Sequence, residues 1–172
     1  MSIAAHGTGA PSEWLLRWQH LMPAHTTVLD LACGHGRHMR ALQARGCLCL
    51  GVDRDPVALE AASAFGDVLQ ADVENNPWPL EGQTFGAVVV TNYLWRTLFP
   101  AILGSLAVGG VLVYETFAAG NETVGKPSNP NFLLQPGELL NVCQVLRVVA
   151  YEDCFLPDPA RFVQRIVAVR ER

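Results

Sequence analysis

The chain has 172 residues, half of them hydrophobic and 16% charged, and its formal net charge is −4. This length suits one well-buried core, and the composition excludes an intrinsically disordered chain. The twelve Lys and Arg residues form no cluster in the sequence. A long nucleic acid is therefore an unlikely partner, because its phosphates need a basic surface.

The sequence shows no signal for a membrane or for secretion. No apolar run approaches the roughly 18 residues of a membrane-spanning helix, and the N-terminal stretch has no basic region followed by an apolar one. Five cysteines without a framework spacing fit reduced thiols. We therefore expect a cytoplasmic protein with one domain over residues 1–172 and no membrane attachment.

Strand-like runs alternate with helix-like runs along the chain. The first element is a helix over residues 11–23 with Ser12 as its N-cap. Apolar periodicity then predicts strands at residues 26–32, 47–53, 67–72, 84–93, 111–117, 147–155 and 161–171. It predicts further helices at residues 36–46, 55–66, 98–110 and 136–146.

The connections indicate how these elements are arranged. The short link at residues 156–160 suits an antiparallel pair, whereas the link at 73–83 has no helical period but is long enough to cross a sheet. The loop at 118–135 is unusually long, and such loops are often functional lids. The pattern predicts an α/β fold with a parallel sheet, an antiparallel edge pair and layers of helices.

A glycine turn follows the first predicted strand, in "VLDLACGHGRH" at residues 28–38. Gly34 and Gly36 remove side chains where a ligand would approach the backbone. A dinucleotide fingerprint needs a third glycine at position 39, where this chain has Met39. The carboxylate of Asp30 would repel a pyrophosphate but suits the ammonium group of an amino-acid zwitterion.

Two more acidic residues end the next two predicted strands. Asp53 ends the second strand, where a carboxylate accepts both hydroxyls of a ribose, and Asp72 ends the third, where the adenine edge would lie. Together with the glycine turn, these acids predict a site for an adenosine cofactor without a pyrophosphate.

The motifs "VLDLACGHG", "GVDRD", "LQADV", "FGAVVVTNYL" and "LAVGGVLVYETF" resemble those of class I S-adenosylmethionine-dependent methyltransferases, in the same order. The resemblance implies a three-layer, Rossmann-like, seven-stranded sheet of order 3-2-1-4-5-7-6 with an antiparallel last strand. The segment "GKPSNPNFLLQPGELL" is similar to tellurite-resistance-type methyltransferases, which implies a small acceptor such as a soft sulfur, selenium or tellurium species. The run "TNYL" departs from the Pro-Pro-aromatic pattern of enzymes that methylate amino groups.

The resemblance implies S-adenosyl-L-methionine as cofactor and assigns residues to each of its parts. Those expected around its methionine part are Asp30, Ala32, Cys33, Gly34 and Gly36. Those expected at the ribose and adenine are Asp53, Arg54, Ala71, Asp72 and Val73. Asn92 and Tyr93 would line the site near the sulfonium.

Several residues allow two interpretations. Cys33, His35 and His38 are of metal-ligating types, but their spacing fits no known site, so we expect no metal. Cys47 and Cys49 could bind a soft metalloid, although small core residues are the better interpretation. The last two residues in question, Trp14 and Trp18, could cover a ligand or simply pack an amphipathic helix.

The sequence favours transfer of a methyl group to a small-molecule acceptor by in-line displacement. Tyr93 and Glu115 are the candidates for a general base, and Arg96, Phe117 and Trp14 are the candidates for substrate contact. The alternatives are a non-catalytic sensor or partner protein that binds S-adenosylmethionine, and an NAD-dependent oxidoreductase. We expect a monomer or homodimer with no nucleic-acid partner.

Overall fold

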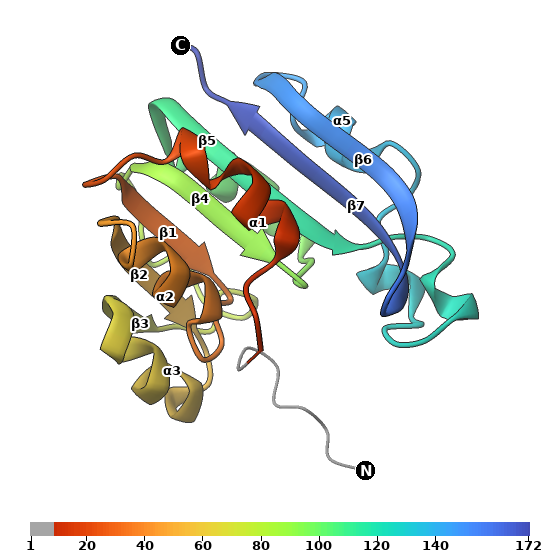
Figure 1. The fold of residues 1–172 in the computed structure, drawn as a ribbon, viewed down its shortest axis with the longest axis horizontal. Coiled ribbons are helices and arrows are strands. Elements are labelled where there is room, and N and C mark those ends of the chain that lie inside the picture. Colours follow the sequence, from red (N-terminus) through yellow and green to blue (C-terminus); the bar gives the residue numbers. More distant parts are fainter. Residues whose placement is uncertain (1–8) are drawn as a thin grey trace.

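Seven strands form one sheet in the order β3-β2-β1-β4-β5-β7-β6 in the computed structural model, which describes residues 9–172 (Figure 1). The strands are β1 (Thr27–Leu31), β2 (Leu48–Asp53), β3 (Asp67–Gln70), β4 (Phe85–Thr91), β5 (Leu106–Phe117), β6 (Arg147–Pro157) and β7 (Ala160–Val169). The helices are α1 (Glu13–Trp18), α2 (Arg37–Gln43), α3 (Pro56–Ala62), α4 (Phe99–Gly104) and α5 (Glu138–Val142). Short 3-10 turns lie at Gln19–Leu21, Ser63–Phe65, Arg96–Leu98, Asn121–Thr123 and Pro130–Phe132.

The strand directions confirm the predicted topology. The pairs β1–β2, β2–β3, β1–β4 and β4–β5 are parallel, whereas β7 pairs antiparallel with both β5 and β6. The predicted order 3-2-1-4-5-7-6 is therefore confirmed, and β7 is the strand that reverses direction.

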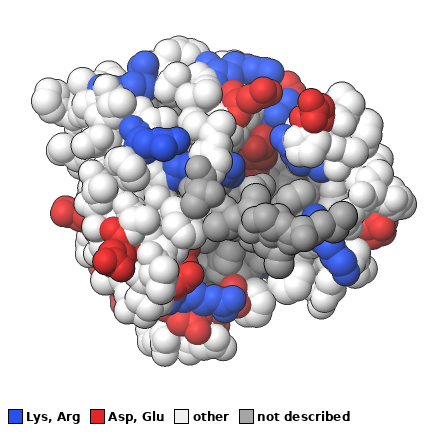
Figure 2. Space-filling model, turned by 60° about the horizontal axis from the view of Figure 1, so that its bottom comes forward, with Lys and Arg blue, Asp and Glu red and all other residues white. Residues whose placement is uncertain are grey.

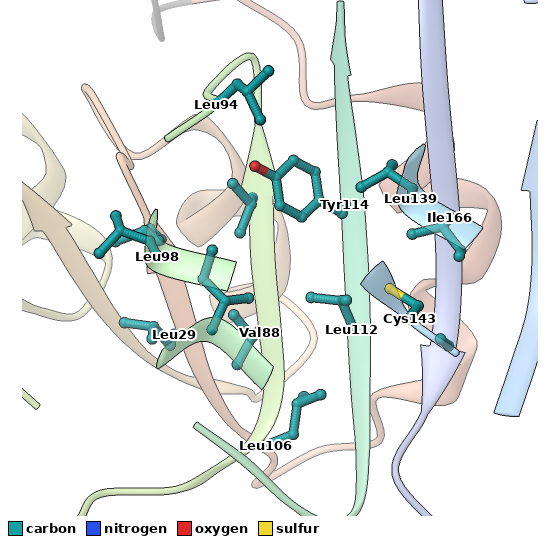
Figure 3. Close-up of a cluster of buried hydrophobic side chains, with 14 of the residues drawn as sticks. Leu29, Val88, Leu94, Leu98, Leu106, Leu112, Tyr114, Leu139, Cys143 and Ile166 are labelled. Carbon is teal, nitrogen blue, oxygen red and sulfur yellow. The ribbon is translucent and has the colours of Figure 1, made fainter. Parts of the chain in front are cut away.

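Each face of the sheet carries its own apolar core, which gives the three predicted layers. Helices α1, α2 and α3 bury Trp14, Met39 and Leu59 against one face. On the other face, α4 and α5 pack against strand side chains, in the cluster that Figure 3 shows around Leu112 and Tyr114. Both faces are covered because a parallel sheet has no face suited to water.

The helix starts follow the capping residues expected from the sequence. The Ser12 hydroxyl accepts hydrogen bonds from the backbone N–H groups of Trp14 and Leu15, which confirms it as the N-cap of α1. Asp55 caps α3 through the N–H of Val57, with Pro56 at the first position of the helix. Capping of this kind contributes on the order of 1 kcal/mol per helix.

Several predicted helix boundaries are wrong: the helices expected at residues 11–23, 36–46 and 55–66 end earlier, at Trp18, Gln43 and Ala62. Residues 106–110, expected to end a helix, form the start of β5, and the pairing register shifts between Phe85 and Ala87 where they join β4. Helix α5 covers only Glu138–Val142, although residues 136–146 were expected to be helical. The link at 73–83 contains no helix, as predicted.

Met39 packs directly on β2, at the position where a dinucleotide-binding fold would have a third glycine. A Cβ on Gly51 of β2 would lie 2.5 Å from the Met39 sulfur and 2.7 Å from the Cys33 sulfur. The small residue that permits close packing of helix on strand is therefore on the strand, and the helix carries the large side chain.

No helix in the described part of the chain is long and apolar enough to cross a membrane.

Candidate functional site

Two adjoining cavities open at the carboxyl ends of β1, β2, β4 and β5, on the face that Figure 2 shows. The larger has a volume of about 680 Å³ and the smaller about 350 Å³. They share four lining residues: Ala32, Asp53, Glu74 and Tyr93. Strand β1 lies between β2 and β4, so this is the point of the sheet at which the strand order reverses and ligands bind.

The larger cavity is built from the segment before α1, the turn after β1 with the start of α2, the ends of β2, β4 and β5, and the loops that follow β3 and β5. Its lining residues are Gly9, Ala32, Cys33, Gly34, Arg37, His38, Asp53, Glu74, Thr91, Asn92, Tyr93, Leu94, Thr116, Phe117, Lys126, Pro127 and Phe132. Ala32 (φ 56°) and Asn92 (φ 54°) adopt the left-handed conformation there. Such strain in non-glycine residues is typical of functional sites.

The smaller cavity lies at the ends of β2 and β3. Its lining residues are Leu31, Ala32, Val52, Asp53, Arg54, Ala71, Asp72, Val73, Glu74 and Tyr93. The Asp72 carboxylate accepts hydrogen bonds from the backbone N–H groups of Glu74 and Asn75 and from the Asn75 side chain. These hydrogen bonds, led by that from the Asn75 side chain, lower the pKa of Asp72.

Asp53 joins the glycine turn to the end of β2. Its Oδ2 accepts a 2.8 Å hydrogen bond from the Gly34 N–H, and its Oδ1 accepts one from the Asp55 N–H at 3.0 Å. These two bonds, to the turn after β1 and to the turn after β2, fix the position of the carboxylate. The carboxylate lines both cavities.

Asp30 is buried behind the turn, with 1% of its surface exposed. Its Oδ2 has no hydrogen-bond partner among the described residues, although His38 Nδ1 lies 3.9 Å away. Burial raises the pKa of Asp30 to about 7, and the Arg37 guanidinium partly opposes that rise. A cationic group placed near this buried carboxylate would stabilise its ionised form.

His38 is a neutral hydrogen-bonding link between α1 and the cavity. Its Nε2 accepts a hydrogen bond from the Ser12 N–H at 3.2 Å, so its proton is on Nδ1, which lies 3.4 Å from Thr91 Oγ1. Burial, with help from Arg37, lowers the pKa of His38 to about 3. The Thr91 hydroxyl oxygen therefore accepts a hydrogen bond from the His38 Nδ1–H, and the hydroxyl can itself donate a hydrogen bond toward the cavity.

Tyr93 lies where the two cavities meet, and its hydroxyl donates a 3.2 Å hydrogen bond to Glu74. Burial and the Glu74 carboxylate raise the pKa of Tyr93. Its phenol therefore stays protonated at neutral pH and acts as a hydrogen-bond donor.

Glu115, the other candidate base, lines neither cavity. Its carboxylate is buried beneath α1, where it accepts hydrogen bonds from the Ser12 hydroxyl at 2.9 Å and from Arg165 at 3.2 Å. Trp14 is also outside the cavities: its ring stacks on the Arg165 guanidinium, and its indole N–H donates to the Ile166 carbonyl.

Of the other two substrate candidates, Phe117 lines the larger cavity and Arg96 does not. Arg96 forms a two-pronged ion pair with Glu138 and donates to the carbonyl groups of Asn131 and Leu133. It holds the β5 loop in place.

Ten of the twelve cofactor residues expected from the sequence line a cavity, the exceptions being Asp30 and Gly36. Gly36 is buried against α3, where an added Cβ would lie 3.0 Å from the Ala62 Cα, and its φ of 78° also favours glycine. It therefore serves the packing of α2 on α3.

Sequence reasoning missed ten residues of the larger cavity: Gly9, Arg37, His38, Glu74, Thr91, Leu94, Thr116, Lys126, Pro127 and Phe132. The sequence contained a signal for two of them: Arg37 directly follows the glycine turn, and Thr91 directly precedes Asn92. Lys126 and Phe132 belong to a loop without periodicity, so only the three-dimensional structure could place them on the cavity.

Within residues 9–172, no group of three His, Cys, Asp or Glu side chains is arranged to hold a metal ion. Cys47 and Cys49 are buried in the core beneath the helices, together with Met39. All five cysteines are free thiols.

Residues 28–110 match the family model of the methyltransferase domain. The matched domain and the shared fold support a class I S-adenosylmethionine-dependent methyltransferase. The chain is similar in structure to TehB from Haemophilus influenzae, with a TM-score of 0.74 and 17% identity. That similarity covers 95% of this chain but only 63% of TehB.

Two further solved structures share the fold of this chain. The N-methyltransferase NodS from Bradyrhizobium japonicum, in complex with S-adenosyl-L-homocysteine, has a TM-score of 0.71 at 18% identity, over 92% of this chain and 84% of that one. A TehB-like methyltransferase from Corynebacterium glutamicum has a TM-score of 0.64 at 19% identity, over 88% and 84%. No curated protein sequence matches the chain.

Proposed function

We propose that this protein transfers a methyl group from S-adenosylmethionine to a small-molecule acceptor by in-line displacement. The observation that carries the proposal is the pair of adjoining cavities. One is lined by the acids at the ends of β2 and β3, and the other extends from the glycine turn to the β5 loop. When bound, the cofactor supplies a methyl group already activated on a sulfonium, so the protein mainly orients the reactants and excludes water.

The residues present fit the cofactor's chemistry. The Oδ2 of Asp30, which has no hydrogen-bond partner among residues 9–172, is a buried acceptor near the turn, where its negative charge would favour an ammonium group. Asp53 would accept the ribose hydroxyls, and Arg54, Ala71, Asp72 and Val73 would surround the adenine in the smaller cavity. Ala32, Cys33 and Gly34 would face the methionine part, with Asn92 and Tyr93 nearer the sulfonium.

We further propose that transfer needs no dedicated general base. The phenol of Tyr93 remains protonated, the Glu115 carboxylate is ion-paired beneath α1, and the unprotonated Nε2 of His38 already accepts a hydrogen bond from the Ser12 N–H. An acceptor that reaches the site with a lone pair available needs no proton removed before attack. A small acceptor also fits the charges in Figure 2, where basic and acidic side chains are interspersed around the hollowed face.

Calorimetric titration with S-adenosylmethionine, S-adenosylhomocysteine and NAD tests the cofactor site. Asp53→Ala should weaken binding of S-adenosylhomocysteine by about 2–4 kcal/mol, because one or two charge-assisted hydrogen bonds to the ribose are lost. Asp67→Ala is the matched control, since Asp67 is an exposed carboxylate at the opposite end of β3 and outside both cavities. Equal affinity of the wild type and Asp53→Ala would refute the ribose assignment, and binding of NAD alone would refute the proposal.

A further inference from the structure

We propose that the acceptor is a small organic anion with a ring-sized apolar body, bound by Lys126 against the rings of Phe117 and Phe132. The inference rests on the proposed function and names the class of substrate for the same site. It concerns the half of the larger cavity that β5 and its loop supply.

Charge is divided between the two sides of the larger cavity. The acidic lining residues, Asp53 and Glu74, lie at the ends of β2 and β3, where the smaller cavity adjoins. Arg37 follows the glycine turn, and its guanidinium donates to the Ala10 carbonyl at 3.1 Å. Lys126 is the one charged lining residue that comes from the β5 loop, and it is the only lysine in the chain.

The loop that carries Lys126 is held at both ends by side-chain hydrogen bonds. Asn121, 1% exposed, donates to the Pro127 carbonyl at 3.0 Å and accepts from the Phe162 N–H of β7 at 3.1 Å. Arg96 holds the carbonyl groups at the far end of the loop. These hydrogen bonds fix the loop as one side of the cavity, and Lys126 lies in the loop between Asn121 and the carbonyl groups that Arg96 binds.

The ammonium group of Lys126 retains most of its binding capacity. Among residues 9–172 it donates one hydrogen bond, to the Ser128 hydroxyl at 3.3 Å, so two of its three protons have no partner in this part of the chain. The Thr91 hydroxyl, which accepts a hydrogen bond from His38 Nδ1, is a further donor. A ligand with acceptor oxygens matches both groups.

Apart from Thr116, the rest of this half of the cavity is apolar. Phe117 and Phe132 line it together with Leu94 and Pro127. The Phe132 ring is 44% exposed, so a ligand body placed against it would bury apolar surface that now faces water.

These two features together select one class of acceptor. A cation would be repelled by Lys126, and a neutral ring would leave the ammonium group unpaired in a partly apolar site. An inorganic anion would lose hydration without using the aromatic walls. An organic anion satisfies both the cation and the walls.

The test uses protein saturated with S-adenosylhomocysteine and three probes: benzoate, its neutral isostere benzamide, and selenite as an inorganic anion. Dissociation constants come from ligand-observed NMR. Benzoate should bind at least tenfold more tightly than either other probe. Reductive ¹³C-methylation adds a second readout, since it labels only Lys126 and the terminal amine, and benzoate should shift the Lys126 signal.

Three variants distinguish the role of Lys126 from a general charge effect. Lys126→Met should abolish the preference for benzoate over benzamide while leaving the affinity for S-adenosylhomocysteine within twofold. Arg40→Met, which removes an exposed cation of α2 outside both cavities, should retain the preference. Phe132→Ala should weaken both ring compounds by a similar factor, severalfold or more.

Equal binding of benzoate and benzamide to the wild type would overturn the inference, and so would selenite binding as tightly as benzoate. An equal loss of the preference for benzoate over benzamide in Lys126→Met and Arg40→Met would also overturn it. Failure of S-adenosylhomocysteine itself to bind would refute the proposed function, whereas its binding without a preference for benzoate would refute the acceptor class alone.

Discussion

Burial of the Asp30 carboxyl group lowers the free energy of unfolding of the cofactor-free protein wherever that group is ionised in the unfolded chain. Asp30 is buried near the end of β1, its Oδ2 has no hydrogen-bond partner in the described part of the chain, and burial raises its pKa to about 7. The unfolded chain ionises the same group near its ordinary value of 3.8. The folded state therefore holds a proton that the unfolded state releases between these two values.

This difference predicts how stability depends on pH. The contribution of Asp30 to folding is fully present below pH 4 and is lost as the pH rises to about 7. Asp30→Asn should therefore raise the free energy of unfolding at pH 8 and change it little at pH 4.5. One unit of raised pKa corresponds to about 1.4 kcal/mol, so a gain of a few kcal/mol is the upper bound. Urea unfolding at both pH values measures it.

The same variant should bind S-adenosylmethionine more weakly at pH 8, because the carboxylate that would favour its ammonium group is gone. A variant that is more stable and binds equally well would show that Asp30 does not serve the cofactor. If the gain in free energy of unfolding over the wild type were no larger at pH 8 than at pH 4.5, that result would contradict the raised pKa.

At the scale of single residues, the acids expected at the ends of β2 and β3 line the cavities, whereas Glu74 and the lining residues of the β5 loop were not expected. Asp53 and Asp72 could be located because an acid that ends a buried strand needs a partner or a ligand. The ion pair of Glu115 could not be foreseen, because its partner Arg165 lies 50 residues away and meets it only through the antiparallel pairing of β5 with β7.

At the scale of elements, the contact of α2 with β2 determines how close the glycine turn lies to the sheet. Gly51 has no space for a side chain, because an added Cβ would lie 2.5 Å from the Met39 sulfur and 2.7 Å from the Cys33 sulfur. The turn and the strand are therefore packed as one unit beneath the cavity.

Gly51→Ala should lower the free energy of unfolding by about 1–3 kcal/mol, since a well-packed core must shift to accept the added methyl group. The control is Gly104→Ala in α4, where nothing lies within 4 Å of the added Cβ. That change should be neutral or stabilising by up to about 1 kcal/mol. Thermal unfolding compares the two, and equal losses would contradict the close packing at Gly51.

Element order could be predicted because helical and strand periods alternate regularly along the chain. The start of β5 could not, because "LAVGG" reads equally well as the end of a helix, and only pairing of Leu106 with Phe85 makes it a strand. Tertiary pairing decided that boundary over local propensity.

At the scale of the molecule, a polar network that is buried at Ser12, Glu115 and Arg165 and reaches the surface at Arg17 joins α1 to the last strands. Ser12 bonds to Glu115, Glu115 to Arg165, and Arg165 to Glu152, which also pairs with Arg17 of α1. The network lies under α1, the helix whose N-cap also bonds to His38 on the cavity. The position of α1 therefore links the C-terminal strands to the site.

Arg165→Met should destabilise the protein by about 3–5 kcal/mol, because the Glu115 carboxylate would be left buried without its cation. Arg147→Met breaks the exposed pair with Glu171 and should cost no more than about 1 kcal/mol. Chemical denaturation of both variants at pH 7 provides the comparison. Similar losses in the two would show that the buried network contributes no more than a surface ion pair.

The most direct test of the central claim is transfer of a labelled methyl group from S-adenosylmethionine into an extract divided into small-molecule, protein and nucleic-acid fractions. We predict enzyme-dependent label in the small-molecule fraction, reduced in Asp53→Ala at subsaturating cofactor and unchanged in Asp67→Ala. Label confined to protein or nucleic acid would contradict the account. So would tight binding of the cofactor with no transfer to any fraction.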